Sequence, residues 1–174
     1  MKKFLILLGV LLTLCSTVFA NDITDANLLT ECRIGPVGLK VRYDAAVLQR
    51  VFGNMTEPPI HKWVSYADGY NFTGLTYEGA RVGLYDGIIS VVGVTVPRSA
   101  NGIVLGTPRG IVVGHDLDTV LRLYGEPYST RTSTEQDGHK RDYYTYGSYT
   151  EGLVFGVNHD TKLVEYIGIN LPSD

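Results

Sequence analysis

Cysteine is scarce in this chain, and its scarcity limits what can hold the fold together. The 174-residue sequence has two cysteines, Cys15 and Cys32, and Cys15 lies in an N-terminal segment that we expect to be removed. The remaining chain would have Cys32 alone, so it could form no internal disulfide. Two interpretations of Cys32 stay open: a small buried apolar residue, or a thiol that pairs with a partner chain.

Basic runs and long apolar runs are also missing. The chain carries 15 lysines and arginines against 18 acidic residues, a net charge of −3, and the basic residues are not clustered. Nucleic-acid binding draws its affinity from clustered cations, so the composition argues against it. The apolar run Phe4–Leu14 is shorter than the roughly 20 residues that span a bilayer. We therefore expect no transmembrane segment in the mature chain.

The N-terminus has the order of a signal peptide. A basic start, Met1-Lys2-Lys3, is followed by the apolar run and then by Val18-Phe19-Ala20, which ends in a small residue. This pattern predicts a signal peptide over residues 1–20 and export to the periplasm or the extracellular space. Leu14 stands where a lipobox has glycine or alanine, which argues against a lipid anchor on Cys15.

One stretch of the sequence occurs twice. Gly38–Gly53 aligns without a gap on Gly110–Gly125, and each copy reads as a short strand, an aspartate, a short amphipathic helix and a glycine. An aspartate before a helix accepts free amide hydrogens of the first turn, and a glycine after it permits the left-handed conformation. The predicted helix caps are Asp44, Gly53, Asp116 and Gly125.

Runs of β-forming residues follow each helix. Asp86-Gly87 is typical of a tight hairpin turn between two strands. Gly93 and Gly168 occupy equivalent places in two long strands, and either a bulge or the close approach of another backbone would explain them. The predicted strands cover Trp63–Tyr66, Tyr70–Tyr77, Arg81–Tyr85, Ile88–Val96, Asp142–Tyr146, Tyr149–Val157 and Leu163–Leu171.

These patterns together predict an α+β fold of two tandem repeats, each a short helix packed on an antiparallel β-meander. After the signal peptide we expect a lead-in segment (21–35), repeat 1 (36–97), a bridge (98–107) and repeat 2 (108–174). Helices this short are marginal in isolation and need a sheet to pack on. The two repeats are expected to form one compact unit.

The repeated pattern G-[LI]-x-V-x-x-D, followed by a short helix that ends in [FY]-G and by a meander, resembles a known family. It is similar to the tandem-repeat fold of β-lactamase inhibitory protein and of small outer-membrane-assembly lipoproteins. The resemblance covers about Pro36 to Pro172. It implies an exported protein that binds other proteins, and it does not identify the partner.

No catalytic or metal-binding motif is present in the sequence. The four histidines fall in predicted loops or turns, and no two of them have the i, i+4 spacing of a helical zinc motif. Neither a G-x-S-x-G nor an S-x-x-K motif occurs. We predict a non-enzymatic protein without metal or cofactor. The alternatives are a structural envelope protein, or a small hydrolase or ligand-binding enzyme that uses Cys32 or one of His61, His115, His139 and His159.

Tyrosine is abundant, with twelve residues against one tryptophan. Neighbouring strand residues such as Tyr143 and Tyr144 point to opposite faces, so some rings must lie on a face that no helix covers. Such rings either form a protein interface or simply favour the strand conformation. On the first interpretation the chain is an exported binding module for a protein or envelope component, with enzyme inhibition as one version. The predicted surface comprises Trp63, Tyr66, Tyr70, Tyr143, Tyr144, Tyr146 and Tyr149.

Two segments that follow the helices complete the prediction. Asn54–Lys62 and Tyr128–Arg141 occupy equivalent places and differ most between the copies. Both are expected to be loops, and the polar run Thr132–Gly138 to be exposed. Tyr144 and Tyr146, on the hairpin beside the second loop, are expected at the centre of the contact surface.

Overall fold

The computed structural model describes residues 28–64, 70–147 and 152–170. The predicted signal peptide and residues 21–27 of the lead-in segment lie outside these residues. The described chain begins with a helical turn α2 (Leu28–Glu31), a ribbon of β1 (Arg33–Ile34) and β2 (Val37–Gly38), and helix α3 (Ala45–Phe52). The later elements are β3 (Ile60–Val64), β4 (Tyr70–Tyr77), β5 (Ala80–Tyr85), β6 (Ile88–Val94), α4 (Leu117–Tyr124), β7 (Ser129–Thr134), β8 (Lys140–Gly147), β9 (Gly152–Asn158) and β10 (Val164–Asn170). None of the described helices is long and apolar enough to cross a membrane.

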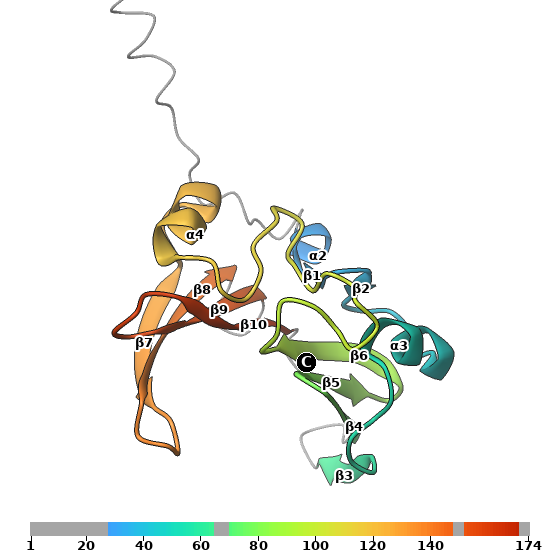
Figure 1. Ribbon diagram of the computed structural model, residues 1–174. Helices are drawn as coiled ribbons and strands as arrows, with labels where there is room; N and C mark the ends of the chain where they lie inside the picture. Colours follow the sequence, from blue (N-terminus) through green and yellow to red (C-terminus); the bar gives the residue numbers. More distant parts are fainter. Residues whose placement is uncertain (1–27, 65–69, 148–151, 171–174) are drawn as a thin grey trace, which may run out of the picture.

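One eight-stranded antiparallel sheet dominates the molecule (Figure 1). The strand order is β3-β4-β5-β6-β10-β9-β8-β7, so each group of four consecutive strands pairs in chain order. The last strand of each group, β6 and β10, pairs with the other at the centre. The two groups therefore share one hydrogen-bonded sheet.

The register at the centre is symmetric. Gly93 pairs with Gly168, Val94 with Ile167, and Val92 with Ile169. Because Val92, Gly93 and Val94 are equivalent in sequence to Ile167, Gly168 and Ile169, the pairing is unchanged when the two halves are exchanged. A local two-fold axis therefore passes between the two glycines.

The predicted α+β fold of two helix-on-meander repeats is wrong. The described residues are mostly β, with one continuous sheet, a two-stranded ribbon and short helices. The backbone groups of β6 form hydrogen bonds with β10 of the other half. The four strands of each half are therefore part of one larger sheet and do not form a separate meander. The strand signals in the sequence are local, whereas this pairing joins residues about 75 positions apart along the chain.

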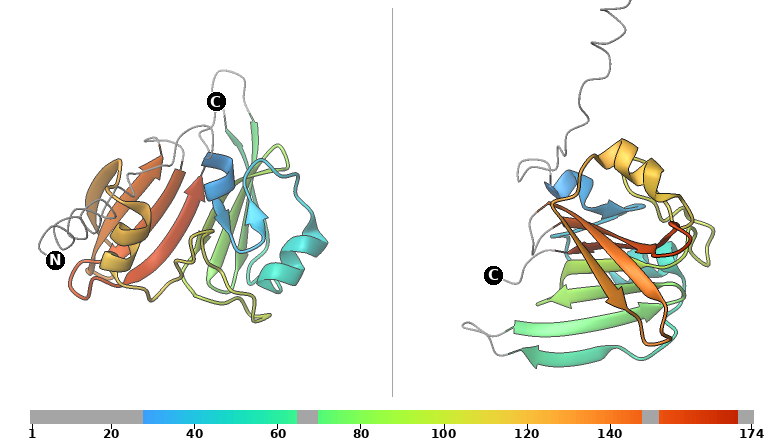
Figure 2. Two further views of the ribbon diagram at one scale, coloured as in Figure 1. Left: turned by 90° about the horizontal axis from the view of Figure 1, so that it is seen from above. Right: turned by 90° about the vertical axis from the view of Figure 1, so that its left-hand side faces the viewer.

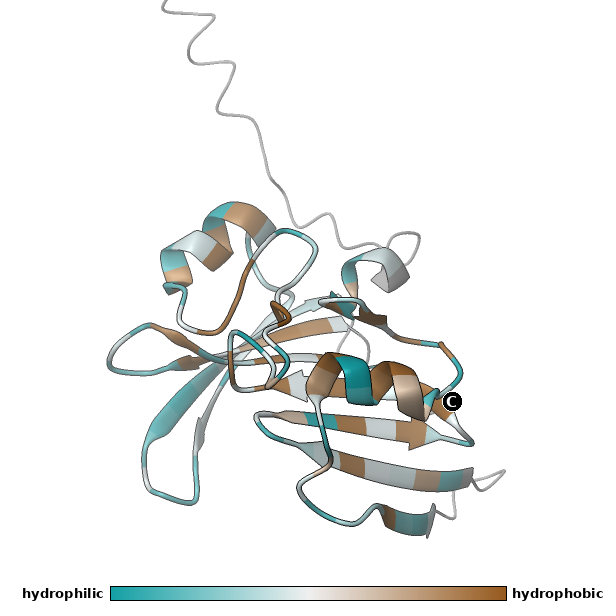
Figure 3. Ribbon diagram, turned by 45° about the vertical axis from the view of Figure 1, so that its right-hand side comes forward, coloured by the Kyte–Doolittle hydropathy of each residue, from teal (hydrophilic) through white to brown (hydrophobic). Residues whose placement is uncertain are grey.

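The helices and the long connection between β6 and α4 cover one face of the sheet (Figures 2 and 3). The ring of Phe52 in α3 packs on Tyr77 of β4 at 5.3 Å, and Tyr124 of α4 packs on Phe155 of β9 at the same centroid distance. Leu105 and Ile111 of the connection are fully buried and belong to the hydrophobic core between the helices and the sheet. The other face of the sheet is uncovered, and it is concave, since the β3 and β7 ends both bend away from the helices (Figure 1).

The two eight-residue helices begin and end at the repeated residues. Asp44 accepts hydrogen bonds from the amides of Ala46 and Val47, at 2.9 and 3.1 Å. Asp116 accepts one from the amide of Thr119 at 2.7 Å. The C-cap residues, Gly53 and Gly125, have φ angles of 93° and 73°, which glycine adopts without strain.

Both segments that were predicted to be loops contain a strand. Ile60–Val64 is β3, an edge strand paired with β4, and Ser129–Thr134 is β7, the opposite edge, paired with β8. The prediction of a loop over 128–141 is therefore wrong, because the segment contains a strand, although β7 is largely exposed as expected for its polar residues. Its all-polar sequence, STRTST, gave no alternation of apolar and polar residues by which to identify a strand.

Candidate binding groove on the open face of the sheet

The concave face holds a groove with a volume of about 790 Å³. It crosses the middle of the sheet, from the β3 edge to the residues of β8 and β10. Strand alternation brings every second residue of each strand to this face, while its neighbours form the core under the helices. Side chains that line it include Glu57, Ile60, Phe72, Thr76, Arg81, Val91, Thr95, Arg141, Tyr143 and Tyr166.

Pairs of glycines form the floor of the groove. Gly74 on β4 pairs with Gly83 on β5, and Gly93 on β6 pairs with Gly168 on β10. A methyl group added at Gly74 or Gly83 would lie 3.3 or 3.1 Å from the ring of Phe72. These glycines are therefore places where an aromatic ring lies flat on the sheet backbone.

Tyr166 covers the central glycine pair in the same way. A methyl group added at Gly93 would come within 2.8 Å of the ring and hydroxyl of Tyr166, and one at Gly168 would also collide with that ring. This ring accounts for Gly93 and Gly168, rather than a bulge at that pair or an approaching backbone. Burial, and then the neighbouring Tyr143, raise the pKa of the Tyr166 hydroxyl, while Arg141 and Arg81 act in the opposite direction.

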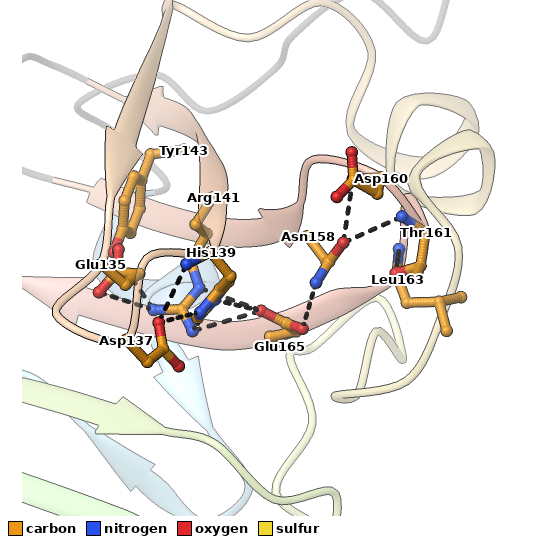
Figure 4. Close-up of polar contacts among 10 residues, drawn as sticks. All are labelled: Glu135, Asp137, His139, Arg141, Tyr143, Asn158, Asp160, Thr161, Leu163 and Glu165. Carbon is orange, nitrogen blue, oxygen red and sulfur yellow. Dashed lines mark hydrogen bonds and ion pairs between the residues drawn. The ribbon is translucent and has the colours of Figure 1, made fainter.

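A charged cluster forms the wall of the groove on β8 and β10 (Figure 4). The guanidinium of Arg141 lies 3.4 Å from Glu135 Oε2 and 3.3 Å from Glu165 Oε2. The Tyr143 hydroxyl donates to Glu135 Oε1 at 2.8 Å, and Asn158 Nδ2 donates to Glu165 Oε1 at 2.8 Å. Arg141 is thus neutralised by two carboxylates that are themselves held in place.

The Tyr143 ring is fixed on both sides. The guanidinium of Arg131 lies 5.3 Å from its centroid, within the range of a cation–π contact, and Tyr166 meets it edge-on at 6.4 Å. With its hydroxyl also bonded to Glu135, this tyrosine has few other orientations open to it. The wall is therefore ordered before any ligand binds.

The structure separates the tyrosines that the sequence grouped together. Tyr143 lines the groove, whereas Tyr144 and Tyr146 point to the face under the helices. Tyr146 is completely buried, so its assignment to the contact surface is wrong, and Tyr144 is partly buried against the same core. The register explains this, because Tyr144 pairs with Phe155 and Tyr146 with Leu153, both core residues.

Trp63 is 65 % exposed but does not line the groove. It pairs with Asn71 on the edge strand and so points to the helix side, beyond the reach of α3. Tyr70 begins β4, and its side chain is not described; Tyr66 and Tyr149 lie outside the described residues. The groove aromatics that the sequence analysis missed are Phe72 and Tyr166. The signal for Tyr166 was its position two residues before Gly168, on the same face of one strand.

The candidate catalytic residues of the alternative hypothesis are not brought to the groove. Cys32 is fully buried beside β1 on the helix side. His139 and His159 each bond a carboxylate near the ends of β8 and β9, and His61 bonds Thr73 at 3.1 Å on the edge strand. None of the four histidines lines the groove, and the described residues contain no group of His, Cys, Asp and Glu arranged to hold a metal ion.

Comparison of this chain with protein-family models, with curated proteins and with solved structures gives no match. The resemblance to β-lactamase inhibitory protein and the assembly lipoproteins therefore stays a prediction.

His139 is predicted to titrate above the ordinary histidine value. The hydrogen bond to Asp137, at 2.5 Å, raises its pKa from 6.5, and the charges of Asp137 and Glu165 add to this rise, while desolvation of the ring and, to a smaller extent, Arg141 oppose it. Since the folded pKa is the higher one, this contact stabilises the hairpin below the unfolded pKa and the contribution is lost as pH rises through the folded pKa. An NMR titration should give a midpoint above 6.5 that falls in Asp137→Asn. A midpoint that does not move in this variant would contradict the assignment.

Proposed function

We propose that this protein is an exported, non-enzymatic binding module that holds another protein in the concave groove of its sheet. One observation carries the proposal: the uncovered face is shaped into a groove of about 790 Å³ whose aromatic and charged wall residues are joined by hydrogen bonds, ion pairs and ring contacts. Tyr143 is held by Glu135 and Arg131, and Arg141 by Glu135. These contacts lie on the uncovered face, where they add nothing to the core under the helices, so we attribute them to ligand binding.

The composition of the groove fits a protein ligand. Aromatic residues and arginine are the residue types most enriched where proteins bind each other, because they combine a large contact area with directed hydrogen bonds. The lining includes Phe72, Tyr143 and Tyr166, together with Arg81 and Arg141. Prior ordering of these side chains lowers the entropy lost on binding, which favours affinity. Inhibition of an exported enzyme is one way in which such a module could act.

Thr76→Trp is expected to abolish partner binding without unfolding the protein. Thr76 lines the groove, and its side chain makes no hydrogen bond among the described residues, so a bulky replacement fills the groove and leaves the core untouched. Thr130→Trp is the matched control, because Thr130 is exposed on the edge strand β7 and pairs with Tyr144, outside the groove. The measurement is affinity capture from a cell-envelope extract and culture fluid, with circular dichroism to verify folding.

The proposed function predicts a protein that the wild type and Thr130→Trp retain and that Thr76→Trp loses. Equal retention by Thr76→Trp would place the contact elsewhere and overturn the assignment to the groove. Failure of the wild type to retain any protein from either source would count against a binding module altogether.

A further inference from the structure

The groove contains an apolar subsite on its β3 side. Its floor is the Gly74–Gly83 pair, and three side chains surround it: Ile60, Phe72 and Val91. A methyl group added at Gly74 would lie 3.8 Å from Ile60 Cβ, and one added at Gly83 would lie 3.2 Å from Val91 Cβ. The Phe72 ring lies over both glycines, 3.3 and 3.1 Å from methyl groups added there, so it presents an apolar surface, flanked by Ile60 and Val91, on which an apolar side chain of a ligand can pack.

A charged subsite lies beside it on the same strand. Arg81 is exposed on β5, paired with Thr76 on one side and Gly93 on the other, which places it next to the Tyr166 ring. Its guanidinium forms no ion pair or hydrogen bond with any other described residue. Glu57 also lines the groove but makes no ion pair with it.

The contrast with Arg141 shows which cation is available to a ligand. Arg141 is bonded to both Glu135 and Glu165, so its charge is already compensated. Arg81 has no such partner within the described chain, and the Tyr166 hydroxyl beside it is a second hydrogen-bonding group. A carboxylate placed here would form a charge-assisted contact with a guanidinium, which is stronger than a neutral hydrogen bond.

The spacing of the two subsites matches an extended chain. Arg81 and Gly83 are two residues apart on one strand, which corresponds to roughly 6.6–6.8 Å. Side chains i and i+2 of any extended segment have the same spacing and the same direction. A ligand segment that lies along β5 can therefore fill both subsites at once.

Building on the proposed function, we infer that the groove recognises an extended segment of a partner protein with an acidic and an apolar side chain two positions apart. The acidic side chain binds Arg81 and the Tyr166 hydroxyl, and the apolar side chain packs on the Phe72 ring that lies over Gly74 and Gly83. Either order of the two residues fits, because the segment can run parallel or antiparallel to β5.

A display selection tests this inference without knowledge of the natural partner. Random twelve-residue segments are selected on the immobilised mature protein and on the variants Arg81→Gln, Arg81→Glu and Thr76→Trp. Arg122→Gln is the matched control, because Arg122 is exposed on α4, away from the groove, and the change of charge is the same. The most enriched segment is then synthesised with glutamate or glutamine at the acidic position, and its Kd is measured by fluorescence anisotropy.

We expect the wild type and Arg122→Gln to enrich segments with an acid two positions from an apolar residue. Arg81→Gln should remove the preference for the acid and raise the Kd of the glutamate peptide about tenfold or more, as for the loss of a charged hydrogen bond. The glutamine peptide should bind both proteins equally, and Arg81→Glu should select basic residues in place of the acid.

The remaining outcomes separate the two proposals. Two outcomes would overturn the acidic specificity and leave the binding groove intact, provided that Thr76→Trp does not bind the selected segments. In the first, the segments selected on the wild type show no preference for an acidic residue. In the second, segments selected on Arg81→Gln show the same acidic preference as those selected on the wild type. Segments that bind Thr76→Trp as well as the wild type, or the absence of any enrichment, would overturn both.

Discussion

Tyr146→Ala is expected to lower the free energy of unfolding by about 3–5 kcal/mol, the cost of deleting a large aromatic side chain from a core. Tyr146 is fully buried between α4 and the sheet, with ring centroids 5.4 Å from Tyr124 and 5.7 Å from Phe155. Its hydroxyl donates to the carbonyl of Gly125 at 3.0 Å, which fixes the end of α4 on the sheet. Because a domain of this size is stable by roughly 5–15 kcal/mol, this one change removes a large part of the total.

The neighbouring residue Tyr143 provides the control. It lies on the same strand and points to the opposite face, so Tyr143→Ala removes the hydrogen bond to Glu135 and the ring contacts but no core packing, and it should cost less, about 1–2 kcal/mol. Tyr146→Phe should cost roughly 1–3 kcal/mol, because only the hydrogen bond is lost and a buried acceptor stays unpaired. Chemical denaturation followed by circular dichroism measures all three. If Tyr143→Ala proved the more destabilising change, the assignment of the two faces would be wrong.

Gly93→Ala is expected to destabilise the protein by about 1–3 kcal/mol, the usual cost of overpacking. The backbone at Gly93 is in an ordinary strand and would accept a side chain, so the cost comes from the Tyr166 ring, which would lie only 2.8 Å from the added methyl group. The ring must move from the sheet and into the groove. The change should therefore also block peptide binding.

A double-mutant cycle isolates that cause. In the Tyr166→Ala background the space above Gly93 is empty, and Gly93→Ala should be neutral or stabilising by about 0.5–1 kcal/mol, as alanine replaces glycine in a strand. The coupling between the two sites is then about 1–4 kcal/mol, measured from four denaturation curves. A cost of Gly93→Ala that is equal in both backgrounds would show that the ring is not the reason for this glycine.

Local sequence patterns were enough to place the two short helices and one hairpin turn. Asp44 and Asp116 stand at the starts of two short amphipathic helices and Gly53 and Gly125 at their ends, because capping depends only on residues within one turn. The hairpin turn at Asp86-Gly87 is confirmed, with both residues at positive φ between β5 and β6. These features involve contacts between residues close in sequence, which a pattern can specify.

The tertiary structure decided how these elements combine. The pairing of β6 with β10 joins both halves into one sheet, and it depends on hydrogen bonds between backbone groups that every residue carries. The pairing of β8 with β9 fixes which face Tyr143, Tyr144 and Tyr146 occupy, since a shift of one residue would exchange the two faces. Tyrosine is compatible with either face, and so composition could not distinguish buried Tyr146 from Tyr143 in the groove. The floor of the groove forms where Gly74, Gly83 and Gly93 of one half meet Gly168 of the other half, beneath the rings of Phe72 and Tyr166, and this meeting depends on the pairing of β6 with β10.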